Sequence, residues 1–425
     1  MSEKHTSLGP PLDLERWRSL PDRAMWIGGA LALLGALLDL KEFAHAWLLG
    51  FMFWLSIGLG ALFLVMMHHL FDAGWSVPVR RQCEHVATLL FPWLLLLWIP
   101  VGLLARQLYP WMSSDPQTDH ALHAKWPLLT LPAFYGISLL CFGAWGFFAH
   151  RLRQWSLRQD ETGEALCTYR MRFYSALGIF VFAITLTLGA ILWMKAMQHQ
   201  WFSTMYGVYY FAGSVWTTLT TVYVIIAVLN RQRVLTHVLH DHQFYFLGTL
   251  IFAFTVFYAY IHFSQYFIIW NANIPEETFW YVIRERGGWF YVGLVIIFGH
   301  FFLPFLALLR IDAKSQWWLM APLMVWAWLM HWVDLGFNIY PVIHPEGPPL
   351  RWLWLPLGCW AFMGGLLAKV YLAKYASAAP YPVKDPRLIE AMGMYHPVPT
   401  QISGGELDQV DDLPDAPPAT ERGAS

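Results

Sequence analysis

A small set of ionisable residues interrupts the long apolar stretches of this sequence, and these are the residues that could do chemistry. They are His68, His69, Asp72, His262, His300, His331 and Asp334. An ionisable side chain inside a bilayer is costly, so each one is a functional hypothesis by default. Imidazole exchanges protons near neutral pH, and a nearby carboxylate can orient it and stabilise its charged form. The set therefore predicts a proton path.

Spacing and depth divide this set into two groups. His331 and Asp334 are three residues apart and share a helix face, while His262 and His300 fall at a compatible depth in the middle or outer half of the membrane. His68, His69 and Asp72 end a span near the inner surface and would mark an inner entrance, with water bridging the gap. The alternative is structural: the first group would tie helices together through hydrogen bonds, and the second would simply meet the lipid headgroups.

Composition indicates what must position these residues. The chain is 57% hydrophobic and only 13% charged, against about a quarter charged in soluble domains. Since a span needs about 20 mostly apolar residues, the sequence predicts an all-α integral membrane protein with about ten transmembrane helices. The expected spans are 25–40, 47–70, 86–106, 127–149, 173–194, 205–229, 243–269, 289–309, 317–339 and 351–373. Spans 2–5 and 6–9 run in the same sense, which allows two parallel four-helix bundles plus a flanking helix pair.

The basic residues predict the orientation. With ten spans, one side of the membrane carries 20 Lys and Arg residues and the other carries seven. Positive residues favour the cytoplasmic side, so both termini are expected there. We expect an N-terminal cytoplasmic segment at 1–24, a membrane domain at 25–375 and a Pro- and acid-rich cytoplasmic tail at 376–425. The tail has little to bury and is expected to be poorly ordered unless a neighbour holds it.

The sequence offers no site for a redox cofactor. The four cysteines form neither C-x-x-C nor C-x-x-C-H, which argues against covalent haem and Cys-ligated iron–sulfur clusters. Haem b would need paired histidines that face each other on neighbouring spans at matching depth. His262, His300 and His331 are the only set at a compatible depth, and depth alone does not make a haem site. We expect no cofactor and no metal in this chain.

Two connections on the outer side are long, at about 107–126 and 270–288. Long connections in a compact protein often carry contacts. Because they lie outside, we expect a partner there, in contact with Asn273, Glu276 and Glu277.

Several segments resemble the NrfD/PsrC-like membrane subunits of bacterial alternative complex III. The longest is Ala259–Thr278, AYIHFSQYFIIWNANIPEET, and shorter ones are AGWSVPVRR at 73–81, WFSTMYG at 201–207 and VDL at 333–335. The segment WFSTMYG at 201–207 is more similar to the ActF branch than to the ActC branch. The chain departs from the family pattern at His262 and at Gly336–Phe337.

The resemblance implies a subunit of a quinol:electron-acceptor oxidoreductase in a respiratory or photosynthetic chain of a bacterial inner membrane. It implies ten helices in two four-helix bundles plus a pair. The implied partners are a paralogous ActC-type ten-helix subunit, a periplasmic multihaem cytochrome c, an iron–sulfur subunit and small membrane subunits. Quinol, haem c and iron–sulfur clusters would belong to those partners, while an ActF-type chain would conduct protons or support the assembly.

Two other functions stay open. The chain could itself bind and oxidise quinol with an iron–sulfur partner. It could instead be a secondary transporter, which would predict inverted repeats and a midplane substrate site between broken helices. Neither feature is evident in the sequence, and nothing in it indicates nucleic-acid binding.

Overall fold

The structure is a computed structural model that describes residues 12–393, and within this range every regular element is a helix. The α-helices are α1 (Leu14–Leu38), α2 (Leu40–Leu70), α3 (Val77–Ala87), α4 (Trp93–Leu103), α5 (Ala105–Leu108), α6 (His120–His123), α7 (Leu131–Thr162), α8 (Ala165–Trp193), α9 (Tyr206–Arg231), α10 (Asp241–Ala272), α11 (Pro275–Arg284), α12 (Gly287–Val295), α13 (Leu303–Leu308), α14 (Trp317–Ile339), α15 (Trp354–Ala376) and α16 (Leu388–Ala391). The short elements are the 3₁₀ turns η1 (Thr88–Leu90), η2 (Pro110–Ser113), η3 (Lys195–Gln198), η5 (Asp312–Ser315), η6 (Tyr340–Val342) and η7 (Leu350–Trp352), and the π-helical η4 (Ile296–Phe302).

Eight helical stretches in the described range are long and apolar enough to cross a membrane, which makes this a multi-pass membrane protein. They are Leu40–Leu70, Val77–Leu103, Leu131–Thr162, Ala165–Trp193, Tyr206–Arg231, Asp241–Ala272, Gly287–Leu308 and Leu350–Ala376. The other two expected spans coincide with α1 and α14, which are helices of 25 and 23 residues but are not among the eight. Charged residues in the first turns of α1, and His331 and Asp334 in α14, make these two helices less apolar.

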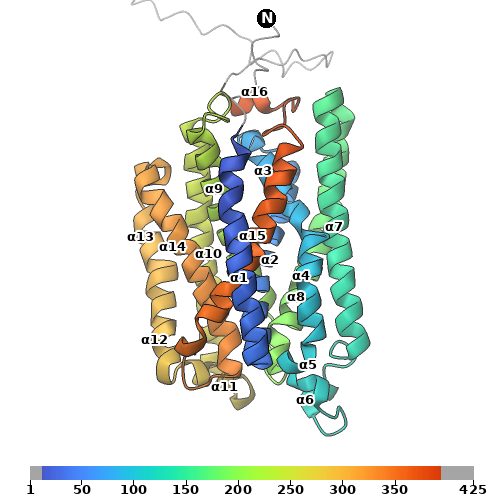
Figure 1. Cartoon of the computed structure of the whole chain (residues 1–425), viewed down its shortest axis with the longest axis vertical. Helices are drawn as coiled ribbons and strands as arrows, with labels where there is room; N and C mark the ends of the chain where they lie inside the picture. Colours follow the sequence, from blue (N-terminus) through green and yellow to red (C-terminus); the bar gives the residue numbers. More distant parts are fainter. Residues whose placement is uncertain (1–11, 394–425) are drawn as a thin grey trace, which may run out of the picture.

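The long helices stand side by side, with α16 at one end of the bundle and α6 and α11 at the other (Figure 1). Helix α2 lies at the centre and is buried along nearly its whole length, as expected for a helix that is apolar on all sides. It contacts α1, α8, α9 and α15. At the contact with α9 a Cβ on Gly60 would lie 2.2 Å from Thr218 Oγ1, so only glycine permits this approach.

Helix α1 packs along α15 through small residues. A Cβ on Gly28 would lie 2.4 Å from the Phe362 nitrogen, and one on Gly365 would lie 2.5 Å from the Pro21 carbonyl. Such close approach of backbones is typical of helix association in membranes. Helix α1 also begins at Leu14, well inside the segment expected to precede the membrane domain.

The third expected span differs most from the prediction. It was expected at 86–106, but its helix begins at Val77 and is interrupted between Ala87 and Trp93. Pro78 at the start of α3 suits a first helical turn, where no backbone N–H is needed. Arg80 and Arg81, expected in a cytoplasmic connection, are therefore helical, and both are buried.

The chain after α15 folds back across the end of the bundle; we call residues 377–393 the C-terminal strap. Gln82 Nε2 donates to the Pro380 carbonyl at 2.7 Å, and Gln243 Nε2 donates to the Ala391 carbonyl at 2.7 Å. The strap therefore meets the exception made for the tail, because neighbouring helices of the chain hold it. Residues 394–425 lie outside the described range.

Candidate functional site

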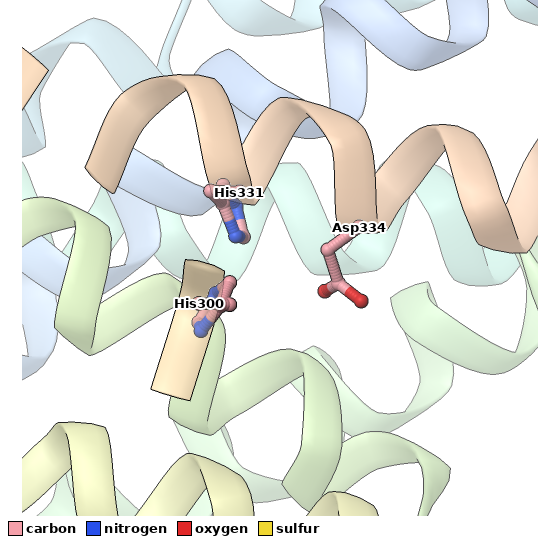
Figure 2. Close-up of side chains that lie close together, drawn as sticks. All are labelled: His300, His331 and Asp334. Atoms are coloured by element: carbon pink, nitrogen blue, oxygen red, sulfur yellow. The ribbon is translucent and has the colours of Figure 1, made fainter. Parts of the chain in front are cut away.

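His300, His331 and Asp334 meet in the interior of the bundle (Figure 2). One ligating atom from each lies within 4.8 Å of the others, and all three side chains are buried. His331 and Asp334 come from α14, where their three-residue spacing puts them on one face, as the sequence predicted. His300 comes from the π-helical η4 opposite. π-Helical turns are rare and often occur at functional sites.

Asp334 is held by hydroxyl and amide groups and not by a cation. Tyr209 Oη donates to its carboxylate. Asn338 Nδ2 donates to Tyr209 Oη at 2.8 Å, and Tyr206 Oη donates to Asn338 Oδ1 at 3.1 Å. No salt bridge to Asp334 occurs among the described residues. The carboxyl group therefore lies at the start of a network of neutral donors and can gain or lose a proton without breaking an ion pair.

His300 is held by its ring faces. The ring stacks between Trp216 and Tyr258, with centroids 4.2 Å and 3.9 Å away. Both ring nitrogens are buried and have no hydrogen-bond partner among residues 12–393. Buried polar atoms are normally paired, so these two nitrogens are free to bind water or to exchange protons.

His331 and His262 each make one side-chain hydrogen bond. A hydrogen bond of 3.0 Å joins His331 Nε2 to Ser56 Oγ on α2, and His331 Nδ1 has no partner. A longer one, 3.4 Å, joins His262 Nδ1 to Tyr258 Oη on the same helix, α10. The structure thus brings all four predicted outer residues into one region, which we call the buried cluster: His262, His300, His331 and Asp334.

A cavity of about 720 Å³ opens beside the buried cluster, between α10, α11, α12 and α14. His262 and Tyr258 line it on one side and Arg284 and Glu285 on another; the other residues of its wall are mostly apolar. Arg284 is buried and donates to the carbonyls of Phe337 and Asn338, each at 2.9 Å, so it is anchored to the end of α14. A largely apolar cavity with a few convergent polar groups is typical of a small-molecule site.

The predicted inner group lies at the strap end, inside a network of charged residues. Hydrogen bonds join His68 to Ser76 and to Arg80, the latter at 2.9 Å. His69 is fully buried, and neither of its ring nitrogens has a hydrogen-bond partner in the described part of the chain. Asp72, which adopts a positive φ of 53°, pairs with Arg387 of the strap and with Arg172 at 2.5 Å.

Asp385 of the strap holds this network together. Its carboxylate accepts from Arg80 Nη1 at 2.6 Å and from Arg387 Nη2 at 3.0 Å. Burial alone would raise the pKa of Asp385, but the two guanidinium groups outweigh it and hold the pKa below its ordinary value. A carboxyl group whose pKa falls on docking stabilises the docked strap above its ordinary pKa and loses that contribution as the pH drops. The strap is therefore held by charge at neutral pH.

Apolar packing separates the two groups. Between Ser56 and His68, α2 presents mostly aliphatic side chains and Phe63. Threonines of α9 bond across helices and within their own helix: Thr218 donates to the Ile57 carbonyl at 3.0 Å, and Thr221 donates to the Thr217 carbonyl at 2.7 Å. Across residues 12–393, side-chain hydrogen bonds alone do not link the buried cluster to His68, so a proton would need water on this route.

The residues expected to contact a partner lie at the other end. Asn273 ends α10 with a positive φ of 50°, and Glu276 is exposed in the first turn of α11. Glu277 is partly buried, and its carbonyl accepts from Trp201 Nε1 at 3.0 Å. A hollow of about 490 Å³ lies between Glu276 and residues 118–121, so the two long outer connections form one surface.

Sequence reasoning missed several residues of the site. Tyr209, Tyr258, Asn338 and Arg284 surround the buried cluster, yet none was among the predicted site residues. Tyr258 belongs to a polar and aromatic stripe of α10 that is visible in the sequence, and this stripe was the available signal. Comparison with models of known protein families finds no match, and comparison with curated proteins finds no significant relative.

Proposed function

We propose that this chain is a proton-conducting membrane subunit of a quinol:electron-acceptor oxidoreductase, of the NrfD/PsrC-like, ActF type in alternative complex III. The observation that carries the proposal is the buried cluster, in which three imidazoles and a carboxyl group lie together without a cation. In the interior of a membrane protein such groups are costly. Proton exchange gives a reason to keep them.

The proposal includes ten spans, with α1 and α14 added to the eight apolar stretches. Helices α2, α3–α4, α7 and α8 then form one four-helix bundle; α9, α10, α12–α13 and α14 form the second; and α1 with α15 forms the flanking pair. The contacts between these helices support this grouping. The strap end, rich in Lys and Arg, faces the cytoplasm of a bacterial inner membrane.

In this arrangement protons enter at the strap end near His68, His69 and Asp72 and reach the buried cluster through water. A cavity of about 400 Å³ lies on this side; its wall is mostly apolar, and His68, Ser76 and Arg80 are its polar groups. The surface formed by the two outer connections would bind the multihaem cytochrome c and iron–sulfur subunits. An ActC-type paralogue would carry the quinol site.

Asp334→Asn tests the proposal, since the amide keeps the shape and the hydrogen bonds but cannot titrate. The complex is purified through this chain in mild detergent and reconstituted in vesicles. We expect haem- and iron–sulfur-containing partners to co-purify and quinol turnover to persist, while quinol-driven proton movement falls on the order of tenfold or more. Wild-type proton movement in the variant would contradict the proton path. Purification without redox partners would contradict membership of the complex.

The cavity beside the buried cluster favours a second candidate, in which this chain itself binds and oxidises quinol and the two electrons pass to an iron–sulfur partner. An isoprenoid quinol would place its ring near His262 and Arg284, and its hydroxyl protons would pass to His262 and then to the other residues of the buried cluster. The apolar wall between α10 and α12 would accommodate the isoprenoid chain.

A further inference from the structure

Another open cavity, remote from the buried cluster, lies on the flank of the bundle near the strap end. Its volume is about 750 Å³, and it lies between the end of α3–η1, the second half of α7 and the end of α15. Its upper wall carries Arg153, Lys374 and His150. Its lower wall carries Phe91, Phe147 and the glycines at 143 and 146.

The two cations of this cavity have no acidic partner. Arg153 is 7% exposed, yet it forms no salt bridge with any residue that the structure describes, and its side-chain hydrogen bond goes to the neutral nitrogen Nδ1 of His85, at 2.9 Å. Lys374 is partly buried and also forms no salt bridge within the described range. The nearby carboxylate of Glu84 is already paired with Arg80 and Arg81, at 3.1 Å and 3.0 Å. A buried guanidinium without a carboxylate is expensive, so a negative group is expected to complete this site.

The lower wall indicates what carries that negative group. Phe91 and Phe147 are 49% and 45% exposed, and Phe147 precedes Arg153 on α7 and so lies farther from the strap end. A Cβ on Gly143 would meet no atom within 4 Å, which leaves an open groove along α7. The site therefore has cations on the side of the strap end and an apolar groove that runs from them along α7, away from that end.

We propose that this cavity binds an anionic phospholipid, with its phosphate on Arg153 and Lys374 and an acyl chain along Phe91 and Phe147. Basic pockets between membrane helices on the cytoplasmic side are suited to such headgroups. The leaflet follows from the orientation proposed above: the lipid belongs to the inner leaflet. The binding itself depends on neither the proton path nor the redox partners.

Native mass spectrometry of the intact chain in detergent tests the site, with phosphatidylglycerol as probe and phosphatidylcholine as the zwitterionic reference. We expect tight retention of phosphatidylglycerol, weakened about fivefold for each charge removed in Arg153→Gln and Lys374→Gln. The matched control is the pair Arg158→Gln and Lys369→Gln, exposed cations of the same two helices that already pair with Glu164 and Asp22. The control should retain the lipid like the parent.

Three outcomes would overturn the proposal. One is unchanged retention of phosphatidylglycerol in Lys374→Gln, a variant that remains informative even if Arg153→Gln fails to fold. Another is equal retention of phosphatidylcholine. The third is full displacement of the lipid by inorganic phosphate in excess, which would mean that the site recognises the phosphate alone. Loss of retention in both variants, with retention in the control, supports the lipid site.

Discussion

At the scale of single residues, the buried cluster differs from an ordinary hydrogen bond between membrane helices. Such bonds stabilise a membrane protein by about 0.6 kcal/mol each, and a serine or an asparagine can form them without a titratable group. His300 makes no side-chain hydrogen bond at all within the described residues and is positioned by Trp216 and Tyr258. Its ring is thus fixed while its nitrogens stay available, which suits proton exchange better than it suits helix association.

Leu294→Trp separates the two candidate functions. Leu294 lines the cavity beside the buried cluster, so the indole would fill much of the space that a quinol ring needs. If quinol binds here, the KM for quinol should rise on the order of tenfold, because a steric clash of about 1.4 kcal/mol or more opposes binding. Val295→Trp is the control, since Val295 is the next residue and is 47% exposed on the outer side of the helix. An unchanged KM in Leu294→Trp, measured on the purified complex, would place quinol oxidation elsewhere and favour the proton-conducting role.

The sequence was sufficient to find the titratable residues of the site but not their partners. Histidine and aspartate stand out in an apolar run because each is costly there. Tyrosine does not, because its ring suits a membrane helix whether or not its hydroxyl is used. The meeting of His300 with His331 also depends on how η4 packs against α14, which no local pattern specifies.

At the scale of helices, small residues determine which helices approach closely. Gly60 lets α2 and α9 contact each other at Thr218 and Ser214, near the centre of the molecule. Since α2 carries Ser56 and α9 carries Tyr209 and Trp216, this contact also sets the positions of groups around the buried cluster.

Gly60→Ala should therefore destabilise the protein. The added methyl would overlap Thr218 Oγ1 and the Ser214 carbonyl, and overpacking costs roughly 1–3 kcal/mol. Gly136→Ala is the matched control: it adds the same methyl on α7, where no atom lies within 4 Å, and a gain in helix propensity of up to about 1 kcal/mol is expected. Thermal unfolding in detergent should show a lower Tm for the first variant and an equal or higher Tm for the second. Equal Tm values for Gly60→Ala and the parent would mean that α2 and α9 can separate without cost.

Hydropathy located the helices well because apolar length is what a membrane selects. It failed where polar residues are buried by other protein segments and not by lipid. Arg80 and Arg81 were assigned to a connection because they are charged, yet Glu84, Asp160 and Asp385 neutralise them within the fold. The strap was assigned to the Pro- and acid-rich tail for the same reason. Its Asp385 and Arg387 stabilise the fold only through ion pairs with residues that are far away in the sequence, such as Arg80 and Asp72.

At the scale of the whole molecule, the two ends of the bundle differ in chemistry. The strap end is closed by a network of salt bridges, while the opposite end carries the long connections and the hollow between residues 118–121 and Glu276. Trp201 stacks on Trp280 with centroids 4.6 Å apart and holds the segment before α9 against α11. This end therefore offers a single, firmly held surface, which suits the docking face proposed above for the redox subunits.

Cysteine labelling tests both the orientation and this docking face. The four native cysteines are buried, so single cysteines introduced at exposed positions can be followed with a membrane-impermeant maleimide. Glu161→Cys lies at the strap end, and Glu276→Cys and Glu346→Cys lie at the other. Because positive residues are retained in the cytoplasm, we expect the last two to react in intact cells once partners are stripped away, and Glu161→Cys to react only after lysis. Fast labelling of Glu161→Cys from outside the cell would contradict the predicted orientation and indicate the opposite one. In the assembled complex, a bound subunit should shield Glu276→Cys, and an undiminished rate there would mean that the partners dock on some other part of the chain.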